Sequence, residues 1–209
     1  MTRIILIRHG ETEWNARGLY QGQLNSPLTA AGRQQAIALA ERLRGTSIDA
    51  LYSSDLGRTQ ETAAPLVAAS SLELRIDSRL RERHYGIFQS LDKTAVATLH
   101  PEAYAGYHSG DPDFQIPEGE STRQFHERIT SCLEDLAGRH DNEQIAIVTH
   151  GGTIGIAIKY VLGLSLEAER RFIMANTSYN LIARDKRGWM LHTLGDISHL
   201  QDESQDDIT

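Results

Sequence analysis

Two histidines in similar surroundings are the residues of this sequence best placed for chemistry. His9 follows the aliphatic run 4–7 after one arginine, and His150 follows the run 145–148 after one threonine. Each is followed by glycine, and aliphatic runs of this kind indicate strands that are buried on both faces. Because open α/β sheets bind ligands beyond the carboxyl ends of their strands, we predict that His9 and His150 meet over one pocket.

Further polar groups are expected at the same pocket, because they also follow short apolar stretches. Arg58 lies near the start of a predicted helix, and Glu82 follows a strand predicted over 72–76. Guanidinium groups bind phosphate oxygens in a bidentate manner, and the backbone N–H groups of a helix start attract anions. These residue types together indicate a phosphate monoester site. Its expected phosphate-binding groups are Arg8, Asn15, Gln21, Arg58, His150 and Gly151.

A pair of histidines at such a site indicates covalent catalysis. A neutral imidazole can attack phosphorus, and the product is a phosphohistidine. The second imidazole is then best protonated, as a further cation around the oxygens of the transferring group. The leaving alkoxide needs a proton, and a buried carboxyl group such as Glu82 can carry one. Chemistry alone leaves open which histidine attacks.

Simpler interpretations exist for several of these residues. Arg58 could pair with Asp55 or Glu61, and Glu82 lies among arginines, where a solvent-exposed charge cluster is common. The coincidence of several such groups at predicted strand ends favours the functional interpretation. The aromatic residues of the same region are candidates for the pocket lining or for ordinary packing: His84, Tyr85 and Tyr107.

The elements that must position these groups alternate between strand and helix. Strands are predicted at 4–7, 48–53, 72–76, 145–148, 179–184 and 189–193, and helices near 29–45, after Arg58, from Ser121 with a capping box to Gln124, and over 153–162. This alternation predicts a three-layer α/β/α sandwich with a mostly parallel central sheet. The last two strands predict a hairpin at the sheet edge, and such an edge allows pairing into a homodimer.

Two stretches lack these signals. Residues 13–28 are rich in Gly, Asn, Gln and Ser and are expected to form a loop. Residues 84–120 hold three prolines with several glycines and tyrosines. Irregular segments of this length are usually functional, so we expect a small insertion that folds over the C-terminal edge of the sheet.

Composition excludes several classes of protein. The 209 residues carry a formal charge of −7 with no basic face, so nucleic acid is not an expected partner. No apolar run approaches the roughly 18–20 residues that cross a membrane. The single cysteine, Cys132, and the lack of a signal-peptide pattern fit a cytoplasmic protein. The histidines show no metal-ligand spacing, so we expect neither metal nor cofactor.

One domain is expected over residues 1–200. The last nine residues, 201–209, hold four acidic groups and no base. A segment of this polarity buries too little apolar surface to order itself, so we expect this tail to be disordered.

Five blocks of the sequence resemble, in order, the signature of the histidine phosphatases, a family that includes the cofactor-dependent phosphoglycerate mutases. The blocks are 8–12 with Trp14 and Asn15 behind it, 58–63, 82–86, 117–121 and 149–152. The resemblance extends from residue 3 to about residue 195. It implies that His9 is the phosphorylated nucleophile and Glu82 the proton donor. It also implies a phosphate pocket of Arg8, Arg58 and His150.

The choice between phosphatase and mutase depends on the insertion. Block 82–86 resembles the mutase form, but mutases carry a longer segment before block 117–121, with bases that hold the substrate carboxylate. Here residues 84–116 contain Lys93 and no arginine. A mutase must retain a bisphosphorylated intermediate and exclude water, so this lack of cations favours a phosphatase acting on a small phosphorylated metabolite. The alternative is a phosphoglycerate mutase, and a phosphate-binding module without turnover is least favoured.

Two further positions depart from the family pattern. Asn25 occurs where the family often has Asp, and Ser90 occurs where Gly is common. Both departures bear on substrate specificity and leave the expected chemistry unchanged.

Overall fold

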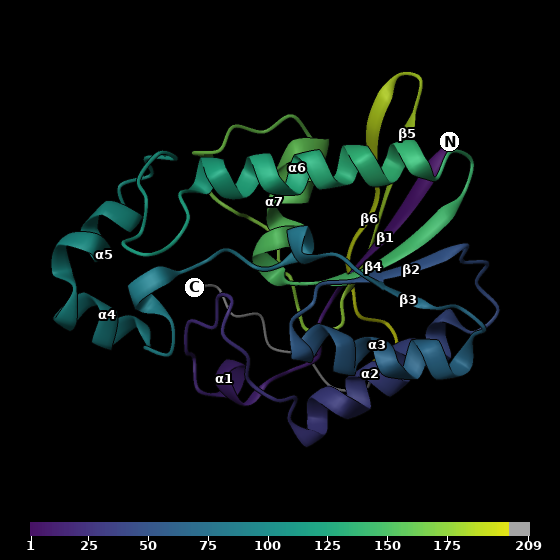
Figure 1. Ribbon diagram of the computed structural model, residues 1–209, viewed down its shortest axis with the longest axis horizontal. Coiled ribbons are helices and arrows are strands. Elements are labelled where there is room, and N and C mark those ends of the chain that lie inside the picture. Colours follow the sequence, from purple (N-terminus) through teal and green to yellow (C-terminus); the bar gives the residue numbers. More distant parts are fainter. Residues whose placement is uncertain (201–209) are drawn as a thin grey trace.

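The computed structural model describes residues 1–200, and its centre is a six-stranded sheet with the order β3-β2-β4-β1-β5-β6 (Figure 1). The first four strands in this order pair in parallel, and β5 and β6 pair antiparallel. The mostly parallel sheet is therefore confirmed. The strands are β1 (Thr2–Arg8), β2 (Ala50–Ser53), β3 (Leu74–Ile76), β4 (Gln144–Thr149), β5 (Tyr179–Asp185) and β6 (Gly188–Asp196).

Helices cover both faces of the sheet. α2 (Ala30–Leu43) and α3 (Gly57–Ala69) pack together against one face. α6 (Thr122–Arg139) and α7 (Gly151–Val161) pack together against the other (Figure 1). The three-layer α/β/α sandwich expected from the alternating pattern is confirmed.

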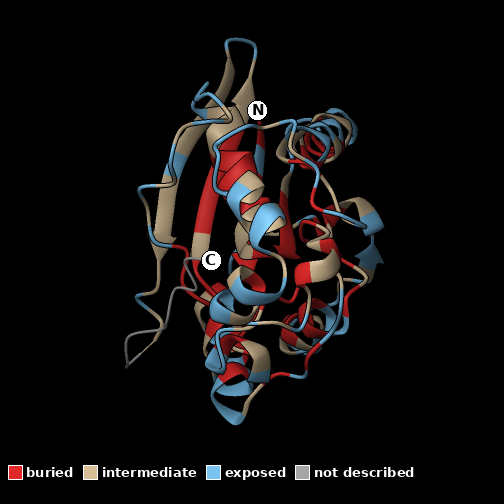
Figure 2. Cartoon of the chain, turned by 90° about the vertical axis from the view of Figure 1, so that its left-hand side faces the viewer, coloured by how far each residue is buried: buried red, intermediate tan, exposed pale blue. Residues whose placement is uncertain are grey.

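The central strand β1 shows why its sequence is continuously apolar. Ile4 and Leu6 pack on the side of α6 and α7, whereas Ile5 and Ile7 pack on the side of α2 and α3. Successive side chains of a strand point to opposite faces, so a strand between two helix layers has no solvent-facing position. Figure 2 shows that buried segments run through the middle of the molecule and that exposed segments lie around them.

The insertion forms a small structure beside the main sheet (Figure 1). It contains the 3-10 helix η2 (Gly86–Phe88) and the helices α4 (Lys93–Leu99) and α5 (Pro101–Tyr107). These two α-helices were not anticipated, because seven residues are too few for a recognisable apolar period. Their stability comes from packing around an aromatic and aliphatic cluster of Tyr20, Phe88, Val96 and Ile116.

Two glycines hold the ends of the insertion together. Gly86 has a φ of +50°, and a Cβ there would lie 2.0 Å from the carbonyl oxygen of Pro117. A Cβ on Gly119 would lie 2.4 Å from the carbonyl oxygen of His84, which also accepts the N–H of Glu120 at 2.9 Å. Only glycine permits this close approach of the two backbones.

Most predicted helix starts agree with the structure. Thr29 caps α2, and Ser121 and Gln124 form the capping box of α6. α3 begins at Gly57, next to Arg58 as predicted, and its N-cap residue Leu56 provides no side-chain cap. α7 begins at Gly151, two residues earlier than expected, because the extended His150 is its N-cap residue.

The remaining differences are small. The four-residue helix α1 (Glu13–Ala16) lies inside the stretch expected to be loop, and the 3-10 helix η1 (Ser78–Leu80) precedes Glu82. The predicted hairpin is confirmed, with β6 at the sheet edge. Residues 201–209, which we expect to be disordered, lie outside the described part of the chain. Within residues 1–200, no helix combines the length and apolar character needed to cross a membrane.

Candidate active site

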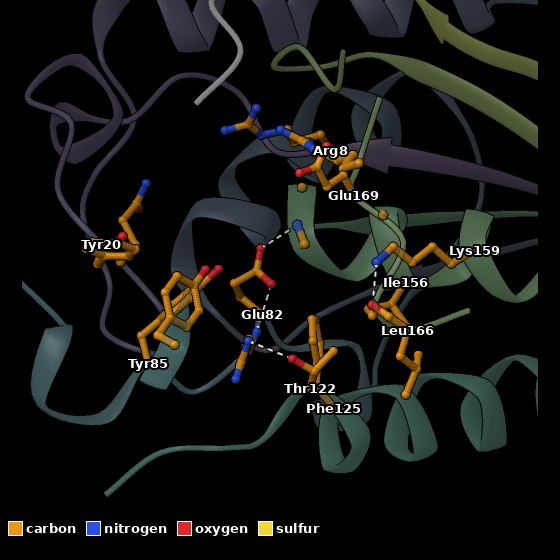
Figure 3. Close-up of a pocket in the computed structure, with 18 of the residues that line it drawn as sticks. Arg8, Tyr20, Glu82, Tyr85, Thr122, Phe125, Ile156, Lys159, Leu166 and Glu169 are labelled. Carbon is orange, nitrogen blue, oxygen red and sulfur yellow. Dashed lines mark hydrogen bonds between the residues drawn. The ribbon is translucent and has the colours of Figure 1, made fainter. Parts of the chain in front are cut away.

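A cavity of about 610 Å³ lies where β1 and β4 end, and the expected chemical groups line it (Figure 3). His150 is fully buried beside the cavity, and its ring centroid lies 5.4 Å from that of His9. The structure thus brings together two histidines that are 141 positions apart in the sequence. The expected site residues that line the cavity are Arg8, His9, Asn15, Gln21, Arg58, Glu82 and Gly151.

The protonation of His9 follows from the hydrogen bond that its ring makes. Its Nδ1 lies 2.8 Å from the carbonyl oxygen of Gly10, and a carbonyl only accepts, so Nδ1 carries the proton. Burial, and the positive charges of Arg58 and Arg8, lower the pKa of His9 well below its usual value. The ring is therefore neutral, with the lone pair on Nε2.

The backbone after His9 is pressed against the start of α2. A Cβ on Gly10 would lie 2.5 Å from the carbonyl oxygen of Gly32, and a Cβ on Gly32 would lie 2.1 Å from that of Glu11. Two glycines are needed for this contact. The hydroxyl of Thr62 on α3 also accepts the Gly10 N–H at 2.9 Å, so both helices of one layer position His9.

His150 has the opposite tautomer. The Nε–H of Arg58 donates to its Nδ1 at 3.2 Å, so the proton of the neutral ring lies on Nε2. This Nε2 is buried, and the described residues provide it with no hydrogen-bond partner. Burial, followed by the charges of Arg58, His9 and Arg8, lowers its pKa well below the usual value. The expectation of a protonated second histidine is wrong, because adjacent guanidinium groups already supply the positive charge.

Within residues 1–200, Arg58 is held by the loop before α2 and not by an acidic residue. Its Nη1 donates to the carbonyl of Leu24 and its Nη2 to that of Gly22, both at 2.7 Å. Asn25 accepts the backbone N–H of Arg58 at 3.1 Å, so this departure from the family pattern fastens the loop to α3. Burial lowers the pKa of Arg58 to about 10. The ion pairs considered for it do not form, because Asp55 pairs with Arg81 and Glu61 with Arg33.

Arg8 is positioned by the segment before β5, which the sequence reasoning missed. Its Nη1 donates to the carbonyl of Met174. The N–H of Thr177 donates to the carbonyls of Arg8 at 3.1 Å and His9 at 3.3 Å, and the Asn176 amide donates to the latter at 3.0 Å. The polar run 176–178 directly before an apolar strand was the available signal, and all three residues are fully buried.

Glu82 reaches the amino end of α7. Its Oε2 accepts the N–H of Gly152 and its Oε1 that of Arg83, both at 2.8 Å. The side chain is 9% exposed, which excludes a solvent-exposed charge cluster. The neighbouring Arg79 and Arg81 pair with aspartates elsewhere.

Arg128 on α6 supports the Glu82 segment and was also missed. Its Nη1 donates to the carbonyls of Arg79 at 2.7 Å and Arg81 at 2.9 Å, and its Nη2 donates to that of Glu82 at 3.1 Å. Its guanidinium also pairs with Glu120, at 2.8 Å. An arginine next to the apolar face of α6 was the only local sign of this role.

The outer cavity wall differs from expectation. Tyr85 and Tyr107 line it, whereas His84 does not and instead accepts the Gly86 N–H. Cations are present although the insertion supplies none of them. They come from segments outside residues 84–116: Arg83, Lys159 and Arg170. The cation-poor sequence of the insertion therefore did not predict the charge of the cavity.

The model of the histidine phosphatase superfamily (branch 1) matches residues 4–197. An Escherichia coli (O1:K1 / APEC) protein named "Probable phosphoglycerate mutase GpmB" is 36% identical and the match covers 100% of this chain and 99% of that protein. The alpha-ribazole phosphatase from Shigella flexneri is 29% identical, with a TM-score of 0.85 and coverage of 93% and 96%.

A phosphoserine phosphatase from Entamoeba histolytica, in complex with 3-phosphoglyceric acid, is similar to the same extent. It is 28% identical, has a TM-score of 0.86, and is matched over 95% of this chain and 99% of its own. Both phosphatases and proteins named as mutases are thus among the relatives. The chain belongs to the histidine phosphatase superfamily.

Proposed function

We propose that this protein is a phosphatase that hydrolyses small phosphate monoesters through a phosphohistidine on His9. The observation that carries the proposal is the pair of tautomers, with a lone pair on Nε2 of His9 and a proton on Nε2 of His150. A nucleophile and a hydrogen-bond donor thus lie side by side, together with Arg8 and Arg58. Transfer of a phosphoryl group requires this combination of attack and charge stabilisation.

In the first step, Nε2 of His9 forms a bond to phosphorus while the bond from phosphorus to the leaving oxygen breaks. The N–H groups of Arg8, Arg58 and His150 stabilise the charge on the remaining oxygens, and the backbone N–H groups at the start of α7 add to this field. The leaving alkoxide takes a proton from Glu82, which becomes a carboxylate.

In the second step, the same carboxylate accepts a proton from water, and the water oxygen attacks phosphorus. The P–N bond breaks and its electron pair returns to Nε2 of His9. Inorganic phosphate leaves, and His9 and Glu82 regain their starting protonation states. Asn15 and Gln21 are proposed to hold phosphate oxygens throughout, because both line the cavity.

Two observations support hydrolysis over intermolecular transfer. The insertion contributes Tyr85, Tyr107, His108, Ser109 and Gly110 to the cavity, and its Lys93 is not among the lining residues. Two structural relatives are named as phosphatases, an alpha-ribazole phosphatase and a phosphoserine phosphatase.

The test is hydrolysis of p-nitrophenyl phosphate in the presence of EDTA. We expect turnover without added metal, and we expect His9→Ala to lower kcat by about 10³-fold or more, because the covalent route is lost. His192→Ala, which changes an exposed histidine of β6, is the matched control with unchanged activity. Full activity of His9→Ala contradicts the proposal.

A mutase is the second candidate, favoured by the cations Arg83, Lys159 and Arg170 at the cavity and by the relative named as a phosphoglycerate mutase. Incubation with 3-phosphoglycerate and a bisphosphoglycerate primer distinguishes the two. Release of inorganic phosphate supports the phosphatase. Isomer interconversion without phosphate release supports the mutase.

A further inference from the structure

The turn before β5 has a backbone conformation that its sequence does not favour. The N–H of Ser178 donates to the carbonyl of Ala175 at 3.0 Å, so Asn176 and Thr177 are the two central residues of a β-turn. Thr177 has a φ of +54° and is fully buried. Turns with a positive φ at this position usually have Gly or Asn there, and for a β-branched residue this conformation is a rare outlier. The surroundings of Thr177 must therefore hold it in place.

This strained turn holds the end of β1, which carries His9. The N–H of Thr177 donates to the carbonyls of Arg8 at 3.1 Å and His9 at 3.3 Å, and the side-chain amide of Asn176 donates to the carbonyl of His9 at 3.0 Å. The carbonyl of Met174, in the same segment, accepts Nη1 of Arg8. A relaxed backbone at Thr177 would change the direction of its N–H. The conformation of Thr177 therefore decides where the backbone of His9, and with it the ring, is held.

The side chain of Thr177 is held by His199. Nη1 of Arg42 lies 3.3 Å from Nδ1 of His199, and a guanidinium only donates, so this Nδ1 carries the lone pair. Burial, followed by the charge of Arg42, lowers the pKa of His199 to about 4. The ring is therefore neutral at neutral pH, with its proton on Nε2. This Nε2–H donates to the hydroxyl oxygen of Thr177 at 3.3 Å.

His199 is itself fixed by two other elements of the fold. Arg42 lies in the last turn of α2, and its guanidinium forms an ion pair with Asp196 at the end of β6. Nη1 of Arg42 also donates to the hydroxyl of Ser198 at 3.1 Å. A continuous series of contacts thus runs from α2 and the end of β6 through His199 to Thr177.

We infer that Thr177 and His199 are positioning residues for His9, an inference that rests on the proposed role of His9 as nucleophile. Glycine would adopt the turn without strain, but it has no hydroxyl for His199 to hold. Neither Thr177 nor His199 is among the residues that line the cavity. A misplacement of about 1 Å can cost about 10²-fold in rate, so a turn that fixes the His9 backbone affects attack on phosphorus without touching the substrate.

The test compares the binding of two oxyanions by calorimetry. Vanadate accepts a fifth ligand, so it bonds to a correctly placed imidazole nitrogen and resembles the transition state of phosphoryl transfer. Sulfate stays tetrahedral and measures only the binding of negative charge in the pocket. Thr177→Val removes the hydroxyl and keeps the branched shape. We expect this variant to bind vanadate about 5- to 30-fold more weakly and sulfate less than about threefold more weakly.

Further variants separate positioning from packing. His199→Phe keeps a ring without nitrogens and should reproduce the selective loss. Both changes remove the same hydrogen bond, so the double variant should lose less than about twofold beyond either single one. Thr177→Ser keeps the hydroxyl and should retain the affinity for vanadate. The matched controls are Thr130→Val, whose hydroxyl bonds to the carbonyl of His126 within α6, and His192→Phe at an exposed position of β6. Both controls should bind the two ions as the wild type does.

The outcomes separate this inference from the proposed function. Equal losses for both ions, unchanged binding of vanadate, or additive losses in the double variant overturn the positioning role and leave the phosphatase proposal intact. A selective loss of vanadate binding, in a protein whose wild type releases phosphate from no monoester, supports the positioning role and contradicts the phosphatase proposal. A wild type that binds vanadate no more tightly than sulfate contradicts both. If Thr177→Val does not fold, His199→Phe decides, because His199 is only half-buried.

Discussion

His9 and His150 have the same side chain and different tasks, because different groups contact their Nδ1 atoms. A backbone carbonyl next to Nδ1 of His9 leaves a lone pair on Nε2, whereas the guanidinium next to Nδ1 of His150 leaves a proton there. A single hydrogen bond therefore decides whether an imidazole is a nucleophile or a donor. Arg58 makes one of these bonds and also lowers the pKa of both rings.

Gly152 provides the first prediction at the scale of single residues. A Cβ at this position would lie 2.3 Å from Oε1 of Glu82, so Gly152→Ala must displace the carboxylate. We expect kcat for a phosphate monoester to fall at least about tenfold, because the proton donor moves out of reach.

The control for this change is Gly138→Ala on the exposed side of α6, where no heavy atom lies within 4 Å. This variant should retain full activity and gain up to about 1 kcal/mol of stability from helix propensity. Thermal melting and steady-state rates measure both effects. A wild-type kcat in Gly152→Ala would show that catalysis does not require the Glu82 carboxylate at its present position.

At the scale of elements, α6 matters for more than the core. Five of its apolar residues recur at helical spacing in the sequence, and all five are buried: Phe125, Ile129, Cys132, Leu133 and Leu136. Arg128, next to this face, binds three carbonyls of the segment that carries Glu82. Periodicity identifies the buried face of a helix, but it does not identify the distant backbone that a polar neighbour contacts.

We predict that Arg128→Met impairs proton donation more than phosphate binding. The loss in kcat should be about tenfold or more for glycerol phosphate, whose alkoxide must be protonated, and smaller for p-nitrophenyl phosphate, whose anion leaves readily without a proton. Arg123 lies on the same helix as Arg128 and forms an exposed ion pair with Asp113. Arg123→Met should change neither rate. Equal losses for both substrates would mean that Arg128 acts on the fold as a whole.

At the scale of the whole molecule, the neutral histidines His9 and His150 are buried where the central strands β1 and β4 end. In the unfolded chain a histidine has a pKa of about 6.5, and burial followed by nearby arginines lowers the pKa of His9 and His150 in the fold. At a pH below about 6.5, these histidines bind protons in the unfolded chain, whereas the buried rings of the folded chain do not. The free energy of unfolding must therefore fall as the pH falls.

Each buried histidine contributes up to about 1.4 kcal/mol per pH unit to the slope of the free energy of unfolding against pH, and the pair contributes up to about 2.8 kcal/mol per pH unit. Urea unfolding between about pH 7 and about pH 5 measures this slope. We expect His9→Gln and His150→Gln each to remove about half of the pair's contribution. A slope that is unchanged in the double variant would show that these rings are not the source.

The sequence by itself determined the elements and the chemical groups, because both depend on local patterns. An apolar run followed by Arg8 and His9 predicts a strand with ligand-binding groups at its carboxyl end. The capping box of Ser121 and Gln124 starts a helix regardless of where that helix packs. The family blocks added the order of these groups along the chain. These signals were sufficient for the three layers, the mostly parallel sheet and seven polar groups that line the cavity, but not for Arg83, Lys159 and Arg170 on its outer wall.

Only the tertiary structure decided how these groups are charged and what surrounds them. The proton of His150 depends on Arg58, which is 92 positions away, and the carbonyl that Arg8 contacts is 166 positions away. Arg170 reaches the cavity because the segment after α7 returns across Gly155. Hydrogen bonding and charge depend on distance in space, and a pattern of neighbours along the chain contains no information about contacts made across the fold.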